Sequence, residues 1–162
     1  MNPAVLSTLM MLAAFSAASD SVPADPCAAR KPGGATITAF VAMLPISARD
    51  TVVNTAVCVL PAKSSTVKFG SYHGELYFDS TAARVLRVEK PAGGMRVENT
   101  RLSGQVNFAG AAPSGFASGA LLRVTLRIKK PGTPPRLRLK MLELNGTDGS
   151  NLMQQLVTSP SP

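Results

Sequence analysis

The side chains that could do chemistry are few in this chain of 162 residues. His73 is the one histidine, and the run Ser71-Tyr-His73 has neither the nucleophile elbow nor the oxyanion motif that a serine hydrolase needs. Glu75 and Asp79 fall on opposite faces if their strand is regular only to Phe78, which disfavours a pair of catalytic carboxylates. We therefore expect no catalytic residue, no cofactor and no enzymatic activity.

The two cysteines, Cys27 and Cys58, have no histidine near them in the sequence, so we expect no zinc or other metal site. In an exported chain, two cysteines indicate one disulfide most simply. The alternative is a pair of unbonded thiols, with Cys58 buried as a small hydrophobic residue.

The N-terminus favours export. Residues 4–18 form an apolar stretch, and small residues follow at Ala17, Ala18 and Ser19, which is typical of a secretory signal peptide over residues 1–19. No Lys or Arg precedes this stretch, and the alternative is a buried N-terminal helix. We expect a bacterial protein that is secreted, periplasmic or on the cell surface, with no membrane span in the mature chain.

Beyond residue 34, short β-type runs alternate with turn residues and no sustained helical periodicity is visible. This pattern predicts an all-β domain, a nine-stranded antiparallel β-sandwich over residues 35–157, preceded by a linker over 20–34 and followed by a disordered tail over 158–162. A slip in alternation at Leu142-Glu143-Leu144 predicts a β-bulge. The expected strands are Ala35–Met43, Thr51–Leu60, Val67–Phe78, Arg84–Glu89, Arg96–Leu102, Gln105–Ala109, Leu121–Lys130, Arg136–Leu144 and Asn151–Val157.

The sequence is basic, with 17 Lys and Arg against nine Asp and Glu and a net charge of +8. Two of the expected strands each carry a strongly basic face, and side by side they would form a site for an anionic envelope polymer. The alternative is a solubilising face or an edge protected by charge. Nucleic acid is not expected, because no stacking aromatics accompany the basic residues. The candidate polyanion-binding residues are Arg123, Arg127, Lys129, Arg136, Arg138 and Lys140.

Three stretches together resemble the cohesin family, the receptor modules of cellulosome scaffolds. They are Gly70–Asp79 followed by Val85–Val88, then Gly104–Ala111, and then Ala117–Lys129. Their order and spacing are similar to those of cohesins over about residues 35 to 157. The resemblance implies a jelly-roll-like sandwich, a fold shared with some carbohydrate-binding modules. It also implies a non-catalytic binding role, often toward a dockerin module on another protein.

In cohesins the partner docks on a flat sheet face that includes the strand ending before Asp79. Alternation around Phe78 sends Tyr72 and Leu76 inward and leaves the intervening residues exposed. We therefore expect a protein or glycan partner on this face, although an ordinary solvated face is the alternative. With no Trp and only two Tyr, a flat aromatic platform for cellulose is excluded. The candidate partner-binding residues are Ser71, His73, Glu75, Tyr77 and Asn107.

Overall fold

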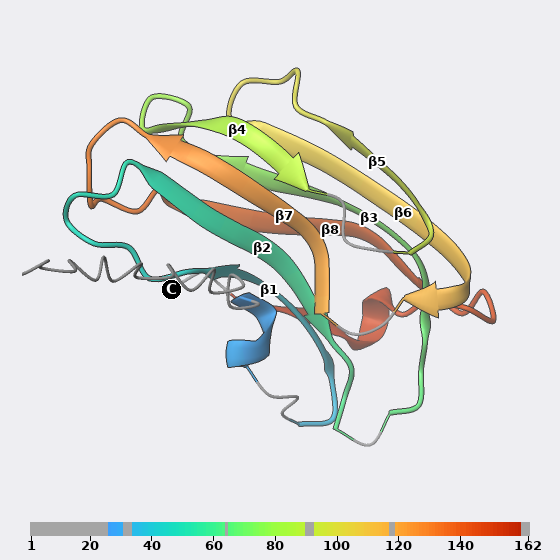
Figure 1. The fold of residues 1–162 in the computed structure, drawn as a ribbon. Helices are drawn as coiled ribbons and strands as arrows, with labels where there is room; N and C mark the ends of the chain where they lie inside the picture. The colour runs from blue at the N-terminus through green and yellow to red at the C-terminus, as the bar shows by residue number, and fades with distance from the viewer. Residues whose placement is uncertain (1–25, 31–33, 64, 90–92, 117–118, 160–162) are drawn as a thin grey trace, which may run out of the picture.

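The computed structural model describes residues 26–30, 34–63, 65–89, 93–116 and 119–159, and these form two β-sheets packed face to face (Figure 1). The predicted signal peptide, residues 1–19, lies outside the described residues. One sheet has five strands in the order β4-β7-β2-β1-β9, and the other has four in the order β5-β6-β3-β8. The strands are β1 (Ile37–Met43), β2 (Val52–Leu60), β3 (Phe69–Phe78), β4 (Ala83–Glu89), β5 (Met95–Asn99), β6 (Gln105–Phe116), β7 (Gly119–Ile128), β8 (Leu137–Gly146) and β9 (Leu156–Thr158).

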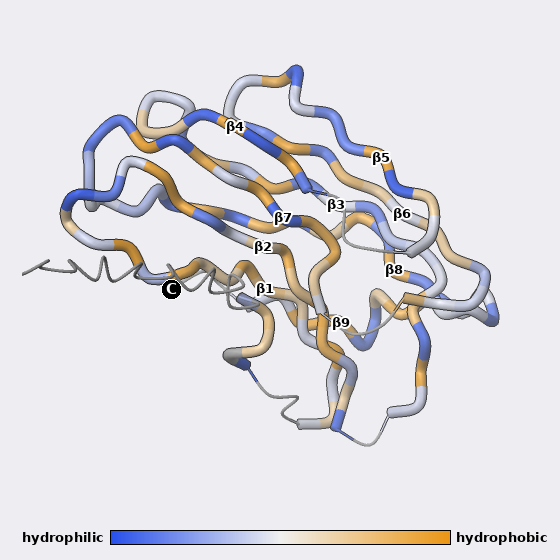
Figure 2. Tube along the Cα trace, in the orientation of Figure 1, coloured by the Kyte–Doolittle hydropathy of each residue, from blue (hydrophilic) through white to orange (hydrophobic). Residues whose placement is uncertain are grey.

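Alternation along the strands builds the core between the sheets. On β7, Leu122, Val124 and Leu126 are buried, and on β3, Tyr72 and Leu76 are buried. Figure 2 shows hydrophobic and hydrophilic residues alternating along strands such as β7. The inward side chains of both sheets belong to one apolar cluster, which accounts for the stacking of the two layers.

The nine predicted strands are all present, with most of their ends shifted by one to three residues and larger differences at β6 and β9. β6 runs to Phe116 rather than ending at Ala109, although Pro113, Ser114 and Gly115 indicated a turn. β9 is short, because residues Met153–Gln155 form the 3-10 helix η2, and it pairs parallel to β1 rather than antiparallel. Thr158, which was expected to begin the disordered tail, pairs with Ala39 in β9, and residues 160–162 of that expected tail lie outside the described residues.

The predicted bulge in β8 is confirmed. The register between β3 and β8 shifts between His73 and Gly74, whose partners are Glu143 and Met141, so Leu142 is the extra residue. The bulge turns Glu143 and Asn145 to the same side of the sheet as Ser71 and His73, because one additional residue reverses the alternation.

A second, smaller apolar cluster lies on the outer face of the five-stranded sheet. The predicted disulfide between Cys27 and Cys58 is confirmed, and it fixes the 3-10 helix η1 (Pro26–Ala29) against β2. Phe40 of β1 is only 4% exposed there, and the Arg30 guanidinium lies 4.9 Å from its ring centroid. The expected linker therefore contains a short helix that covers part of a sheet.

Arg96 of β5 connects the two sheets. Its Nη1 donates hydrogen bonds to the Tyr72 hydroxyl of β3 and to the Leu121 carbonyl of β7, at 3.0 and 3.1 Å. The Tyr72 hydroxyl also donates to the Leu121 carbonyl, at 2.9 Å. The Arg96 guanidinium lies 4.6 Å from the Phe116 ring centroid, a favourable cation–π geometry. Desolvation raises the pKa of Tyr72, although the Arg96 charge opposes the rise.

Candidate partner-binding face

The outer face of the four-stranded sheet carries all five residues predicted to bind a partner. Ser71, His73, Glu75 and Tyr77 alternate along β3, and Asn107 of β6 lies directly opposite Glu75. All are half-buried, which is normal for side chains in the middle of an open sheet face. The structure thus brings these side chains together.

One end of this face is polar and cationic. The Tyr77 hydroxyl donates a hydrogen bond to Glu75, and Lys140 Nζ of β8 lies 3.6 Å from the Glu75 carboxylate. The Arg138 guanidinium lies 4.4 Å from the Tyr77 ring centroid. The hydrogen bond from Tyr77 lowers the pKa of Glu75, and the Lys140 charge adds to this effect; the same bond raises the pKa of Tyr77. Glu75 is therefore a charged acceptor at neutral pH.

A second polar group is formed where β3 meets the bulged part of β8. The Ser71 hydroxyl donates to Glu143 Oε1 at 3.0 Å, and the Asn145 amide donates to the same oxygen at 2.7 Å. Asn145 Nδ2 also lies 3.1 Å from the Ser71 hydroxyl oxygen. These bonds hold the exposed Glu143 carboxylate at a defined position beside His73.

Sequence reasoning missed the apolar part of this face. Met95 and Val97 of β5 point outward and are 79% and 68% exposed, next to the small residues Ala111 and Ala109 of β6. Between these and Ser71, His73 and Glu143 lies an open depression of about 610 Å³. The depression forms because the short side chains of Ala109 and Ala111 lie between longer side chains on the neighbouring strands. An exposed apolar strip with polar groups beside it is typical of a binding surface.

The apolar strip was missed because the charged residues of β5, and not its apolar residues, point into the sandwich. Arg96 and Glu98 point toward the other sheet, while Met95 and Val97 face outward, the reverse of the usual pattern. Inward charges are one way in which edge strands are protected from unwanted pairing, and β5 is an edge strand. The alternation of charged and apolar residues in Met95–Asn99 was the signal that could have revealed this strip.

The polyanion site was expected only if its two basic strands lay side by side, and they do not. β7 belongs to the five-stranded sheet and β8 to the four-stranded sheet, so their basic residues lie on opposite sides of the molecule. Arg123 and Arg127 project from the outer face of one sheet, and Arg138 and Lys140 from that of the other. The alternating strands were assigned correctly, but alternation does not say which strands are neighbours.

Within the described part of the chain, no three His, Cys, Asp or Glu side chains gather in a way that could hold a metal ion. The same residues contain no helix of the length and hydrophobicity required to span a bilayer.

Comparisons with known proteins bear on the fold. No protein-family model matches the sequence, and no curated protein matches it. Solved structures do match: a non-cellulosomal cohesin from Archaeoglobus fulgidus superposes with a TM-score of 0.63 at 17% identity, over 78% of this chain and 88% of that one. The sixth cohesin of scaffoldin B from Acetivibrio cellulolyticus, bound to a dockerin, gives 0.64 at 8% identity, over 78% and 96%.

A type I cohesin–dockerin complex from Clostridium thermocellum gives a TM-score of 0.60 at 16% identity, over 82% of this chain and 94% of that one. The matched modules therefore share the sandwich over nearly their whole length, at identities too low to carry residue roles across. The fold of this protein is cohesin-like, as the sequence resemblance implied.

Proposed function

We propose that this protein is a non-catalytic module that binds a protein partner of dockerin type through the outer face of its four-stranded sheet. The observation that carries the proposal is the exposed apolar strip of Met95 and Val97 on β5, which lines the same depression as the Glu143 carboxylate held on β8. A solvated sheet face has no need to expose two large apolar side chains side by side. The cohesin-like fold supports the proposal, because two of the three matched modules were solved with a dockerin bound.

The surface defines the chemistry of the partner. An apolar side chain of the partner would fill the depression over Ala109 and Ala111, and a cationic group beside it would meet Glu143. Ser71, His73 and Asn107 would supply polar contacts at the rim, whereas Tyr77 is already hydrogen-bonded to Glu75. A glycan is less well suited, since this face has one aromatic ring, Tyr77, among its described residues.

The place of action would be outside the cytoplasm. The bond between Cys27 and Cys58 supports an oxidising compartment, because such bonds form and persist mainly in exported proteins. We infer that the module works on the cell surface or in the periplasm.

Photo-crosslinking tests the proposal directly. A photoreactive phenylalanine analogue at Val97 should capture one defined protein from the extracytoplasmic fraction, and the same analogue at Val157 of β9 should not. Val157 is a matched control because it is an apolar residue, 48% exposed, on the other sheet.

With the captured protein purified, Val97→Glu should weaken binding at least about tenfold, since it places a charge in the apolar strip that lines the depression. Val157→Glu should leave the affinity within about twofold of the unmodified protein. Equal effects of the two substitutions, or capture from Val157 alone, would remove the four-stranded sheet as the contact surface.

A further inference from the structure

The sandwich is open along the side where the edge strands β4 and β5 lie. A hollow of about 520 Å³ separates β4 from the residues that follow β5 and from the end of β3. Its walls include Phe78 and Val85, which are partly buried and belong to the margin of the apolar core. Core side chains are therefore reachable from solvent here, on a different part of the molecule from the four-stranded sheet's outer face.

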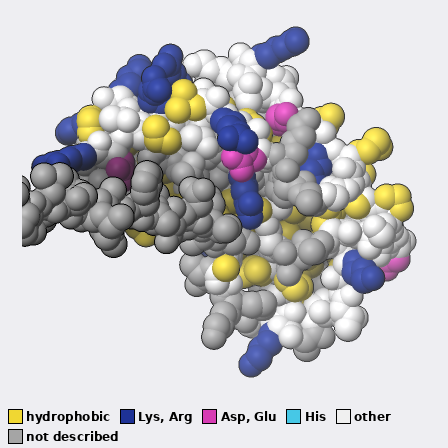
Figure 3. Space-filling model, viewed as in Figure 1, with side chains coloured by type: hydrophobic (Ala, Val, Ile, Leu, Met, Phe, Trp, Pro, Cys, Tyr) yellow, Lys and Arg dark blue, Asp and Glu magenta, His cyan; other side chains and the backbone are white. Residues whose placement is uncertain are grey.

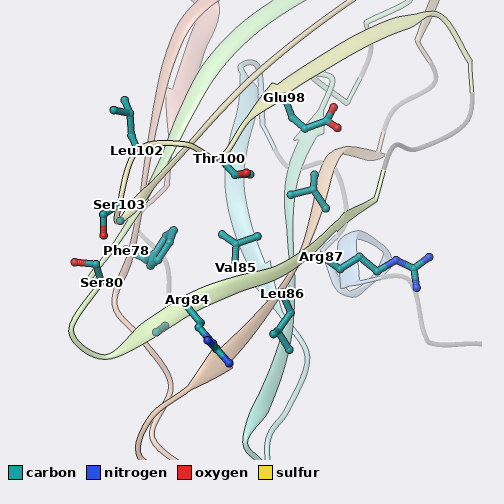
Figure 4. A pocket seen from close by; sticks show the side chains of 13 residues that line it. Phe78, Ser80, Arg84, Val85, Leu86, Arg87, Glu98, Thr100, Leu102 and Ser103 are labelled. Carbon is teal, nitrogen blue, oxygen red and sulfur yellow. The ribbon is translucent and has the colours of Figure 1, made fainter.

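Figure 4 shows how the side chains around this hollow lie. Val85 of β4 points into the space toward Thr100, and Phe78 closes one end beside Ser80 and Ser103. Arg84 and Leu86 point to the opposite side of β4. Val85 and Phe78 thus form the apolar part of a lining that is otherwise largely polar, and a row of β4 side chains lies on the outer face beside the hollow.

The backbone of β4 offers a template for another strand. β4 is the last strand of its sheet, paired on one side with β7 and with no strand on its other side among the described residues. The other edge strands are β9 with three residues, β5 with five and β8 with ten; β4 has seven, and its residues Ala83–Val88 line the hollow. β4 has a bulge at Leu86, where its register with β7 shifts. On either side of that bulge, its open edge can pair with an extended segment of another chain through main-chain N–H and C=O groups.

The side chains beside this edge select for negative charge. Arg84 of β4 lies directly opposite Arg127 of β7, and on its other side Arg127 lies opposite Val52 of β2. Two guanidinium groups opposite each other are unfavourable unless an anion lies between or beside them. Arg87 adds a third, with a side chain that is 72% exposed and 3.4 Å from Glu89. Figure 3 shows Lys and Arg side chains gathered over β4 and β7.

We propose that the open edge of β4 binds an extended acidic peptide segment of a partner chain as an added strand. Alternate residues of the segment point into the hollow and are apolar, because they contact Val85 and Phe78. The intervening residues are acidic, because they lie on the outer face beside Arg84 and Arg127. This site is independent of the proposed dockerin-type surface, since it lies on the other sheet.

A labelled peptide tests the proposal with a defined probe. A fluorescein-labelled segment of alternating Val and Glu should bind the intact protein in fluorescence anisotropy, and the matching Val–Lys segment should not. Arg84→Glu should weaken binding of the Val–Glu peptide at least about tenfold. Arg138→Glu, the same charge change on β8, should leave it within about twofold, and Arg84→Glu should not alter capture by the Val97 crosslinker.

A second peptide separates strand addition from attraction by charge alone. The Val–Glu peptide with alternate N-methylated residues keeps its charge but cannot pair along one edge, so it should bind at least about tenfold more weakly. Hydrogen exchange of amides in Ala83–Glu89 should slow when the unmodified peptide binds. Equal binding of both peptides, equal effects of the two arginine substitutions, or absence of binding would each overturn the proposal.

Discussion

Each outer face of the sandwich carries an apolar patch, and the two patches are covered to different extents. On the five-stranded sheet, Phe40 points outward and is covered by η1, which the Cys27–Cys58 bond holds in place. On the four-stranded sheet, Met95 and Val97 point outward and are largely exposed. The first apolar patch is part of the folded structure, whereas the second contributes little to it. Exposed apolar surface that does not serve folding is best explained by a partner.

The largest expected effect is the difference in stability between two alanine variants, one in each patch. Phe40→Ala should lower the free energy of unfolding by about 3 kcal/mol, because it leaves a cavity beneath η1. Val97→Ala should change it by less than about 0.5 kcal/mol, since the side chain is mostly in solvent. Urea denaturation of the two variants measures both values. Similar losses in the two variants would mean that the exposed strip is a structural element, and the contrast between the faces would fail.

A smaller effect is expected where the two sheets are joined. Arg96→Met removes the hydrogen bonds to Tyr72 and Leu121 but keeps an apolar stem, and it should lower the free energy of unfolding by about 2 kcal/mol. Arg138→Met is the control, because Arg138 is exposed and lies over Tyr77 at the surface; it should cost less than about 0.5 kcal/mol. Thermal and urea unfolding compare the two. Equal stability of both variants would show that Arg96 does not hold the sheets together.

The smallest effect is the dependence of stability on pH. Hydrogen bonds from Thr81, Ser150 and Tyr77 lower the pKa values of Asp79, Asp148 and Glu75, respectively. These carboxylates stay charged to lower pH in the folded chain than in the unfolded chain. Their stabilisation is therefore present above about pH 4 and is lost as the pH falls through the lowered pKa values.

Asp79→Asn isolates one part of that dependence. The variant should lose less stability than the unmodified protein between about pH 5 and pH 2.5, because position 79 no longer gains a proton. Urea midpoints measured across this range give the two slopes. A steeper fall in the variant would contradict the lowered pKa of Asp79.

Much of the fold could be predicted from the sequence, because alternation depends on local chemistry. Residues Leu122–Ile128 and Leu137–Met141 alternate between buried and more exposed positions, and the slip at Leu142 correctly predicted a bulge. The pairing of Cys27 with Cys58 followed from there being two cysteines in a chain expected to be exported. The partners of each strand could not be predicted in this way, which is why the basic residues of β7 and β8 were wrongly combined.

The candidate site was predictable only in its polar part. Ser71, His73, Glu75 and Tyr77 follow the alternation of one strand, and Asn107 follows that of its neighbour. Met95 and Val97 could not be found by the rule that apolar residues point inward, since the inward positions of β5 belong to Arg96 and Glu98. The extension of β6 was missed because Gly110 and Gly115 suggest turns, although Gly110 is needed where the Tyr72 ring packs against the strand.

Hydrogen exchange of the protein with and without its captured partner tests the central claim most directly. The account predicts that binding slows exchange in β5, β6 and β3, around Val97, Ala109 and His73, and leaves β1, β2 and η1 unchanged. Slower exchange confined to the five-stranded sheet, with β5 and β6 unaffected, would contradict it.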